Sequence, residues 1–292
     1  MEEQNVQQLP EEIPAQEQPK PKKKGKVVKR VLYFLLLGIF VGVFIYCAIY
    51  ITNYMVGSKQ QSDAYDDLAG LRDKYLNDAT EPQATLPSGI TGEQRGGVEA
   101  GGILPEYREL HALNNDLVGW INIPGTKVDY PVLQRKDVLN FYLYRDFEGE
   151  TSRWGSLYVR EACDVFAPSD NVVIYGHHMR DGTMFAELLK YQKKSFWEEH
   201  QTFTFDSIYE RHTYQVIAVF KTSANIGEGF SYHTFNTAAS EKEFNDFIKT
   251  VKKLDFYDTG ITAEYGDMLL TLSTCEYTLD NGRFVVVAKR IS

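Results

Sequence analysis

Three residues in the C-terminal part of the chain could together perform cysteine-based acyl transfer, and two of them stand close in sequence. Cys275 ends the apolar run 267-DMLLTLSTC-275, and Arg283 opens the next apolar run eight positions later. If these runs are antiparallel strands joined by 276–282, the thiol and the guanidinium face each other across the mouth of a hairpin. An arginine there would favour the thiolate and could donate hydrogen bonds to a developing oxyanion.

A histidine would supply the proton transfers that this chemistry needs. The segment 171-NVVIYGHHMRDGTMF-185 places His177 at the end of an apolar run, directly after Gly176, which permits close backbone approach. His178 would point the other way if the strand continues. Taken singly, a cysteine ending an apolar run is more often a buried small hydrophobe, and an arginine or histidine there is more often a solvated rim residue. Their joint placement at strand ends favours a catalytic site.

Other cofactor and metal chemistries have no support in the sequence. It contains no C-x-x-C, H-E-x-x-H, G-x-S-x-G, P-loop or G-x-G-x-x-G motif, so we expect neither a cofactor nor a metal. The net charge of -9 argues against a general nucleic-acid binder. Cys163 and Cys275 could form one disulfide or could both be free thiols.

The N-terminal region predicts a membrane anchor. A basic cluster, 20-KPKKKGKVVKR-30, precedes 31-VLYFLLLGIFVGVFIYCAIYI-51, a run of 21 residues without a charge. As a helix, such a run spans roughly 30 Å, the thickness of the hydrocarbon core. We interpret 31–51 as a retained signal anchor in the cell membrane, with 1–30 as a cytoplasmic basic tail and the rest extracellular. A cleaved signal peptide is the alternative, but its apolar region would be shorter, at about 7 to 15 residues.

The rest of the chain predicts a mainly β domain that is joined to the membrane anchor by a stalk and linker. Residues 57–104 read as an extracellular stalk and linker, with Tyr65, Leu68, Leu71 and Tyr75 at helical spacing. Helices are expected at 105–114, 137–143, 182–199 and 240–253. Strands are expected at eight places, which favours a closed barrel or a sandwich: 118–123, 127–133, 156–161, 171–177, 201–206, 213–222, 267–275 and 283–291.

Three segments, and their order along the chain, resemble the sortases, the cysteine transpeptidases of Gram-positive cell surfaces. The segment 271-TLSTC-275 with Arg283 resembles their active-site strand, and 174-IYGHHM-179 followed by 182-GTMF-185 resembles the histidine motif of class B. The segment 120-WINIPGTKVDYPV-132 is similar to their early strand pair.

The resemblance implies a fold and a set of site residues. The fold is an eight-stranded sortase β-barrel with flanking helices over 105–292, preceded by the single transmembrane helix. The implied catalytic residues are His177, Cys275 and Arg283. Ser273 and Glu276 are weaker candidates for contacts with the substrate peptide, since class B enzymes often carry an acid beside the cysteine.

The resemblance also implies an activity and partners. The substrates would be surface proteins with a C-terminal sorting signal of the N-P-x-T type, cleaved after Thr through a cysteine thioester. The acceptor would be an amine of a peptidoglycan cross-bridge or its lipid-linked precursor, or of a pilin. No metal is implied.

Two other classes of protein compete with this interpretation. An L,D-transpeptidase would need S-x-G-C around the cysteine, and papain-like hydrolases place Cys before His, the reverse of the order here. The remaining alternative is a membrane-anchored surface β-domain that binds a ligand without catalysis, with Cys275 inert.

Overall fold

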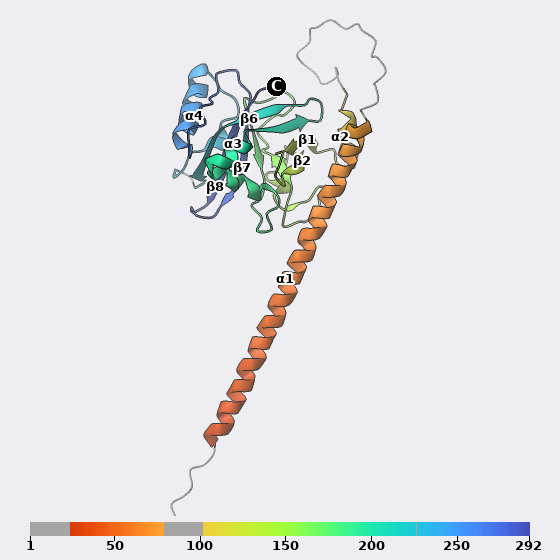
Figure 1. The fold of residues 1–292 in the computed structure, drawn as a ribbon, viewed down its shortest axis with the longest axis vertical. Coiled ribbons are helices and arrows are strands. Elements are labelled where there is room, and N and C mark those ends of the chain that lie inside the picture. Colours follow the sequence, from red (N-terminus) through yellow and green to blue (C-terminus); the bar gives the residue numbers. More distant parts are fainter. Residues whose placement is uncertain (1–23, 79–101, 226) are drawn as a thin grey trace, which may run out of the picture. The chain divides into compact units, whose positions relative to one another are not determined.

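The computed structural model describes residues 24–78, 102–225 and 227–292 (Figure 1). The chain divides into two compact units, Met1–Gly57 and Ser58–Ser292. The greater part of the predicted basic tail and residues 79–101 of the predicted stalk and linker lie outside the described residues. The fold below is that of the second unit unless stated.

The predicted membrane span lies within one long helix. α1, Lys24–Asp78, contains no proline and includes all of 31–51. The apolar side chains of that run are exposed, and the helix is long and apolar enough to cross a membrane. A helix suits that environment because it satisfies every backbone hydrogen bond within the segment.

The end of α1 belongs to the second unit, and this differs from the predicted stalk. The side chains of Tyr65 and Leu68 are buried, and Arg72 pairs with Asp129 at 2.6 Å between Nη1 and Oδ1. The Arg72 guanidinium also lies over the ring of Trp120, 4.5 Å from its centroid. The spacing of the apolar residues had indicated a helix, and the structure packs that helix against the barrel. The compact body therefore begins at Ser58 and not near residue 105.

The body is the predicted closed barrel of eight strands, in the order β1-β2-β3-β4-β7-β8-β6-β5. The pairs β2–β3 and β4–β7 are parallel and the others are antiparallel. Long buried apolar runs lie on the paired strands β6 and β8, at 216–220 and 284–288. The strands are β1 Leu117–Asn122, β2 Asp129–Leu133, β3 Leu157–Val159, β4 Asn171–Tyr175, β5 Thr202–Ser207, β6 Thr213–Ser223, β7 Leu269–Glu276 and β8 Gly282–Arg290.

Short helices cover the barrel and its connections. In α4, the Ser240 hydroxyl accepts a hydrogen bond from the Glu243 amide and caps the helix. One face of α4 is apolar and buried, and Figure 1 shows the helix lying along the outside of the barrel. The helix predicted over 137–143 is only a 3₁₀ turn at 141–144, and the one over 182–199 is split in two. The bounds are α2 Pro105–Leu113, η1 Phe141–Tyr144, η2 Phe185–Gln192, α3 Lys194–Glu199, η3 Tyr232–Thr234 and α4 Glu241–Leu254.

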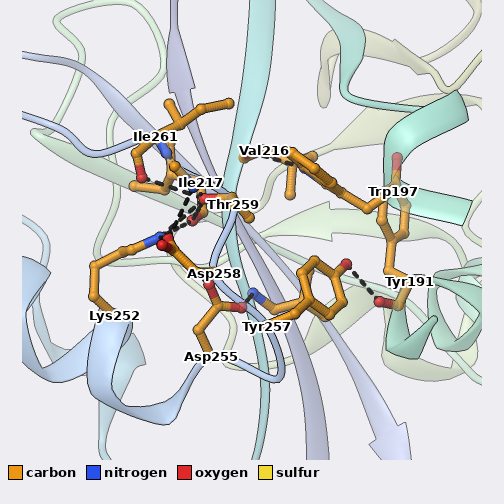
Figure 2. Close-up of polar contacts among 12 residues, drawn as sticks. Tyr191, Trp197, Val216, Ile217, Lys252, Asp255, Tyr257, Asp258, Thr259 and Ile261 are labelled. Carbon is orange, nitrogen blue, oxygen red and sulfur yellow. Dashed lines mark hydrogen bonds and ion pairs between the residues drawn. The ribbon is translucent and has the colours of Figure 1, made fainter. Parts of the chain in front are cut away.

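A bulge in β6 is held by the segment that follows α4 (Figure 2). The β6–β8 register shifts between Val216 and Ala218. The Ile217 carbonyl accepts hydrogen bonds from Lys252 Nζ at 2.9 Å and from Thr259 Oγ1 at 2.7 Å. These donors satisfy a buried carbonyl that the bulge removes from the ladder, so α4 is fastened to the strand that it covers.

Candidate active site

The barrel brings the ends of β4, β7 and β8 together. β4 and β7 are parallel, with Tyr175 opposite Ser273, and the Gly176 amide donates to the Ser273 carbonyl at 3.1 Å. His177 and Cys275 each follow that last pair by two residues, so both lie at the same end of the sheet. In the antiparallel β7–β8 ladder, Cys275 lies opposite Arg283. The three predicted catalytic residues therefore meet at one rim of the barrel.

These residues line a common pocket of about 420 Å³. Its floor comes from the ends of the strands, and its walls come from the η1 segment, the η3 loop and the β7–β8 turn. Besides His177, Cys275 and Arg283, the lining includes Leu139, Asn140, Leu143, Tyr158, Arg160, Glu161, Tyr175, Gly176, Ala224, Tyr232, His233, Ser273, Thr274 and Asn281.

The imidazole of His177 is fixed by a backbone carbonyl. Its Nε2 lies 2.6 Å from the Leu143 carbonyl oxygen, and its ring contacts Tyr144 with centroids 5.4 Å apart. A carbonyl can only accept, so Nε2 carries a proton and Nδ1 is the nitrogen left to exchange one. Burial lowers the pKa of His177, and the bond to Leu143 offsets part of that effect.

Gly176 is required by the packing beneath His177. A Cβ atom on this residue would collide with the side chains of Leu157 and Phe185, both of which are fully buried. Phe185 also donates its amide to the His177 carbonyl at 2.9 Å. The strand that carries the histidine therefore lies directly on the core, which fixes the height of the imidazole above the barrel.

His178 contacts the backbone of the cysteine residue and not its thiol. Its Nδ1 lies 3.2 Å from the Cys275 carbonyl oxygen, and its ring stacks on Tyr277 with an interplanar angle of 26°. Of the two adjacent histidines, His177 lines the pocket and His178 does not.

Cys275 is a free thiol and its side chain is half-buried. A cysteine nucleophile needs a thiol that is free and accessible. Cys163 is also free but buried, with Sγ 3.6 Å from the Asn171 carbonyl oxygen, and burial raises the pKa of its thiol. Of the two alternatives left open by the sequence, the structure has the free thiols and no disulfide between these residues.

Arg283 is oriented by the turn that precedes it. Its Nη1 donates to the Gly282 carbonyl at 2.9 Å and to Asn281 Oδ1 at 3.1 Å. Both acceptors are neutral, so they do not cancel the positive charge of the guanidinium. Because these bonds hold the guanidinium at the rim of the pocket, they also orient its other N–H donors.

Ser273 and Glu276 occupy different environments. Ser273 lines the pocket floor, but it is buried and its Oγ lies 2.5 Å from the Tyr232 hydroxyl. Glu276 is not among the pocket residues. Its carboxylate accepts from Lys221 Nζ at 2.9 Å, from the Thr278 hydroxyl at 2.6 Å and from two amides of the turn. Burial alone would raise the pKa of Glu276, but these hydrogen bonds outweigh it and the pKa is lowered.

Several pocket residues were not predicted from the sequence. Tyr232 lies on η3, far from the strand motifs, and reaches the pocket only through the fold. Burial raises its pKa, so its hydroxyl is neutral near pH 7. Thr274, adjacent to the cysteine, has a buried hydroxyl without a hydrogen-bond partner among the described residues. Its position inside TLSTC was the one available signal.

Within the described ranges, no group of three or more His, Cys, Asp or Glu side chains is arranged to hold a metal ion. The side chains that line the pocket include the Cys275 thiol, the His177 imidazole, the Arg283 guanidinium and the hydroxyls of Tyr232 and Ser273. This set is suited to nucleophilic attack on a carbonyl, with proton transfer and stabilisation of the oxyanion.

Comparisons with known proteins agree with this architecture. A family model described as the sortase domain matches residues 121–291. Sortase B of Listeria monocytogenes is 34% identical over 194 residues, covering 66% of this chain and 76% of the relative. Sortase B of Staphylococcus aureus is 35% identical over 191 residues, covering 65% and 76%. A solved S. aureus sortase B–substrate complex superposes with a TM-score of 0.68 at 30% identity, covering 81% of this chain and 99% of that one. The chain therefore belongs to the sortase family, and these relatives assign it to class B.

Proposed function

We propose that this sortase cleaves the sorting signal of exported proteins and joins them to an amine through a thioester on Cys275. The observation that carries the proposal is the shared pocket, in which Cys275 lies opposite Arg283 and His177 is a further lining residue. The signal would be of the N-P-x-T type with cleavage after Thr, as the sequence resemblance implies. The sortase B of S. aureus has been solved as a complex with its substrate, which supports a substrate-binding role for this fold.

In the first step, the Cys275 thiolate attacks the Thr carbonyl carbon and a C–S bond forms. The carbonyl oxygen becomes an oxyanion, which Arg283 stabilises with charge-assisted hydrogen bonds. When the intermediate collapses, the C–N bond breaks, and His177 gives its Nδ1 proton to the leaving amine. The products are a thioester on Cys275 and a free C-terminal fragment.

In the second step, an acceptor amine attacks the thioester carbonyl. His177, now neutral, removes the proton from the amine through Nδ1, and the C–S bond breaks to restore the thiolate. The acceptor would be an amine of a peptidoglycan cross-bridge, of its lipid-linked precursor or of a pilin. Glu276 has no step here, because its carboxylate is already held by Lys221 and Thr278.

The proposed location follows from α1. With the basic cluster retained on the cytoplasmic side, 31–51 would cross the cell membrane and the barrel would be extracellular. Exported substrates and a lipid-linked acceptor would then share one surface with the enzyme, which raises their effective concentration.

The test compares the full chain in detergent with its Cys275→Ala variant, using a fluorogenic N-P-Q-T-type peptide and intact-mass analysis. We expect cleavage and an acyl adduct on the wild type only. Cys163→Ala is the matched control, because it removes the other thiol of the barrel unit and should leave cleavage unchanged. Wild type that neither cleaves nor acquires an adduct, with Cys275 unreactive to an alkylating agent, would instead favour the non-catalytic surface domain.

A further inference from the structure

The last part of α1 contacts both segments that hold His177, although it contributes no residue to the pocket. We propose that Tyr65 is a positioning residue for His177, acting through the loop before β3 and through the loop after β4. The proposal rests on the catalytic role proposed above for His177, but its contacts can be tested without a substrate.

The first path runs through the phenol hydroxyl. Tyr65 Oη lies 3.2 Å from the Gly155 carbonyl oxygen and 3.2 Å from Ser156 Oγ. Gly155 has a φ of 59°, and its Cα lies so close to the Leu143 carbonyl that a Cβ could not be accommodated. That carbonyl is the acceptor for His177 Nε2. Movement of Gly155 would therefore be transmitted directly to the group that orients the imidazole.

The second path runs through the ring. Tyr65 packs edge-on against Tyr130, with centroids 5.1 Å apart. The Tyr130 hydroxyl accepts a hydrogen bond from the Met184 amide at 3.2 Å. The backbone of Met184 has a φ of 56°, which is uncommon for a residue other than glycine. Met184 bridges to His178, and the next amide, that of Phe185, donates to the His177 carbonyl. This path fixes the backbone of the histidine.

A third contact from the same helix supports the second path. Ser58 Oγ donates to Asp181 Oδ2 at 2.7 Å, within the loop that joins His178 to Met184. Asp181 also accepts from Trp154 Nε1 at 2.9 Å and from the Thr183 hydroxyl at 2.6 Å. One carboxylate thus joins α1, the loop before β3 and the loop after β4.

The burial of Tyr65 suits a fixed donor. Its side chain is only 4% exposed, and burial raises the pKa of the phenol, so the hydroxyl stays protonated over the working pH range. A residue that only filled space would not need a hydroxyl directed at two acceptors of the same loop. The hydroxyl is therefore the part of Tyr65 to remove.

The test uses the full chain in detergent micelles with ¹⁵N-labelled histidine. The Nε2–H proton of His177 is assigned by its loss in His177→Gln, and its exchange with water is measured. Tyr65→Phe keeps the ring on Tyr130 and removes only the hydroxyl. Tyr75→Phe is the matched control, because Tyr75 lies on the same helix and its hydroxyl contacts Glu109 at the surface.

We expect Tyr65→Phe to speed this exchange about tenfold and to lower kcat about tenfold with KM nearly unchanged, since small misplacements of a catalytic group are costly. Tyr75→Phe should match the wild type in both. Unchanged exchange in Tyr65→Phe would overturn the proposal, even if kcat fell, because the residue would then act only on stability. A wild type without peptide cleavage would instead refute the proposed function, and the exchange measurement would still decide the role of Tyr65.

Discussion

The Leu143 carbonyl decides which nitrogen of His177 can transfer a proton. Because Nε2 donates to that oxygen, the proposed acid and base are both Nδ1. The same bond holds the ring while its charge changes, so the two proposed steps can use one orientation. Burial acts against the imidazolium, and this gives the site a measurable pH dependence.

We expect His177 to titrate below about 6.5, the ordinary value for histidine, because desolvation disfavours its charged form. Between the lowered folded pKa and about 6.5, the unfolded chain binds more protons at this residue than the folded chain does. The contribution of His177 to stability should therefore be lost as the pH falls through that interval. Histidine ¹⁵N shifts recorded against pH measure the midpoint, and a midpoint at or above 6.5 would contradict the burial argument.

We expect that no other residue, including lysine, can fully replace Arg283. Lysine keeps the positive charge but lacks the planar set of donors, of which one contacts the Asn281–Gly282 turn and the others are proposed to bind the oxyanion. We expect Arg283→Gln to lower kcat by about 10² to 10³, as for the loss of an oxyanion donor, and Arg283→Lys to recover only part of it. Peptide cleavage by the full chain measures both variants. Equal activity of Arg283→Gln and wild type would remove Arg283 from the proposed mechanism.

At the scale of elements, the β6 bulge shows how a strand irregularity is stabilised by a distant segment. Asp255 accepts from the Val219 amide at 2.9 Å, so the chain after α4 contacts β6 at the bulged residue Ile217 and again two residues later. Tyr257 extends the same fastening to η2, donating to the Tyr191 carbonyl at 2.7 Å (Figure 2).

Thr259→Val should destabilise the barrel, because it removes one of the two donors to the Ile217 carbonyl and an acceptor of the other donor, Lys252 Nζ. The expected cost is about 1 to 2 kcal/mol, or a Tm lower by roughly 2 to 8 °C for a unit of this size. Thr250→Val is the matched control, since the Thr250 hydroxyl donates to the Asp246 carbonyl of its own helix and not to β6. A Tm equal to that of the control would mean that Lys252 alone satisfies the Ile217 carbonyl.

The parts of this fold that the sequence predicts are those with a periodic signal. β7 and β8 end within one residue of the predicted strands 267–275 and 283–291, and α4 follows from the spacing of its buried face. The orienting group of His177 has no such signal, because any residue at position 143 supplies a carbonyl. Tyr232 was missed for a related reason: η3 is a short irregular turn that only the tertiary fold brings to the pocket.

At the scale of the whole molecule, the enzyme body includes a helix that composition had assigned to the stalk. The segment from Ser58 is polar overall, because only one stripe of it is buried and the rest faces solvent. Polar composition therefore indicated a spacer, whereas the stripe with Tyr65, Leu68 and Arg72 indicates an integral element.

A chain that begins at Ser58 should be clearly more stable than one that begins at Pro105. The shorter chain loses the burial of Tyr65 and Leu68 and leaves Asp129 without Arg72, for a cost of about 3 kcal/mol or more. Urea unfolding of the two soluble chains, followed by tryptophan fluorescence, compares them directly. Equal midpoints and slopes would show that residues 58–104 are dispensable for the barrel.

The closed order of the described strands also limits how any peptide can be recognised. Because each of the eight described strands pairs with two neighbours, the barrel offers no free edge to which an extended chain could add as a further strand. Selectivity must then reside in side chains and in the connections at the rim, such as the β7–β8 turn and the η3 loop. Those connections can be exchanged or lengthened while the ring stays intact, which makes them the natural positions for redesigning the range of peptides that this scaffold accepts.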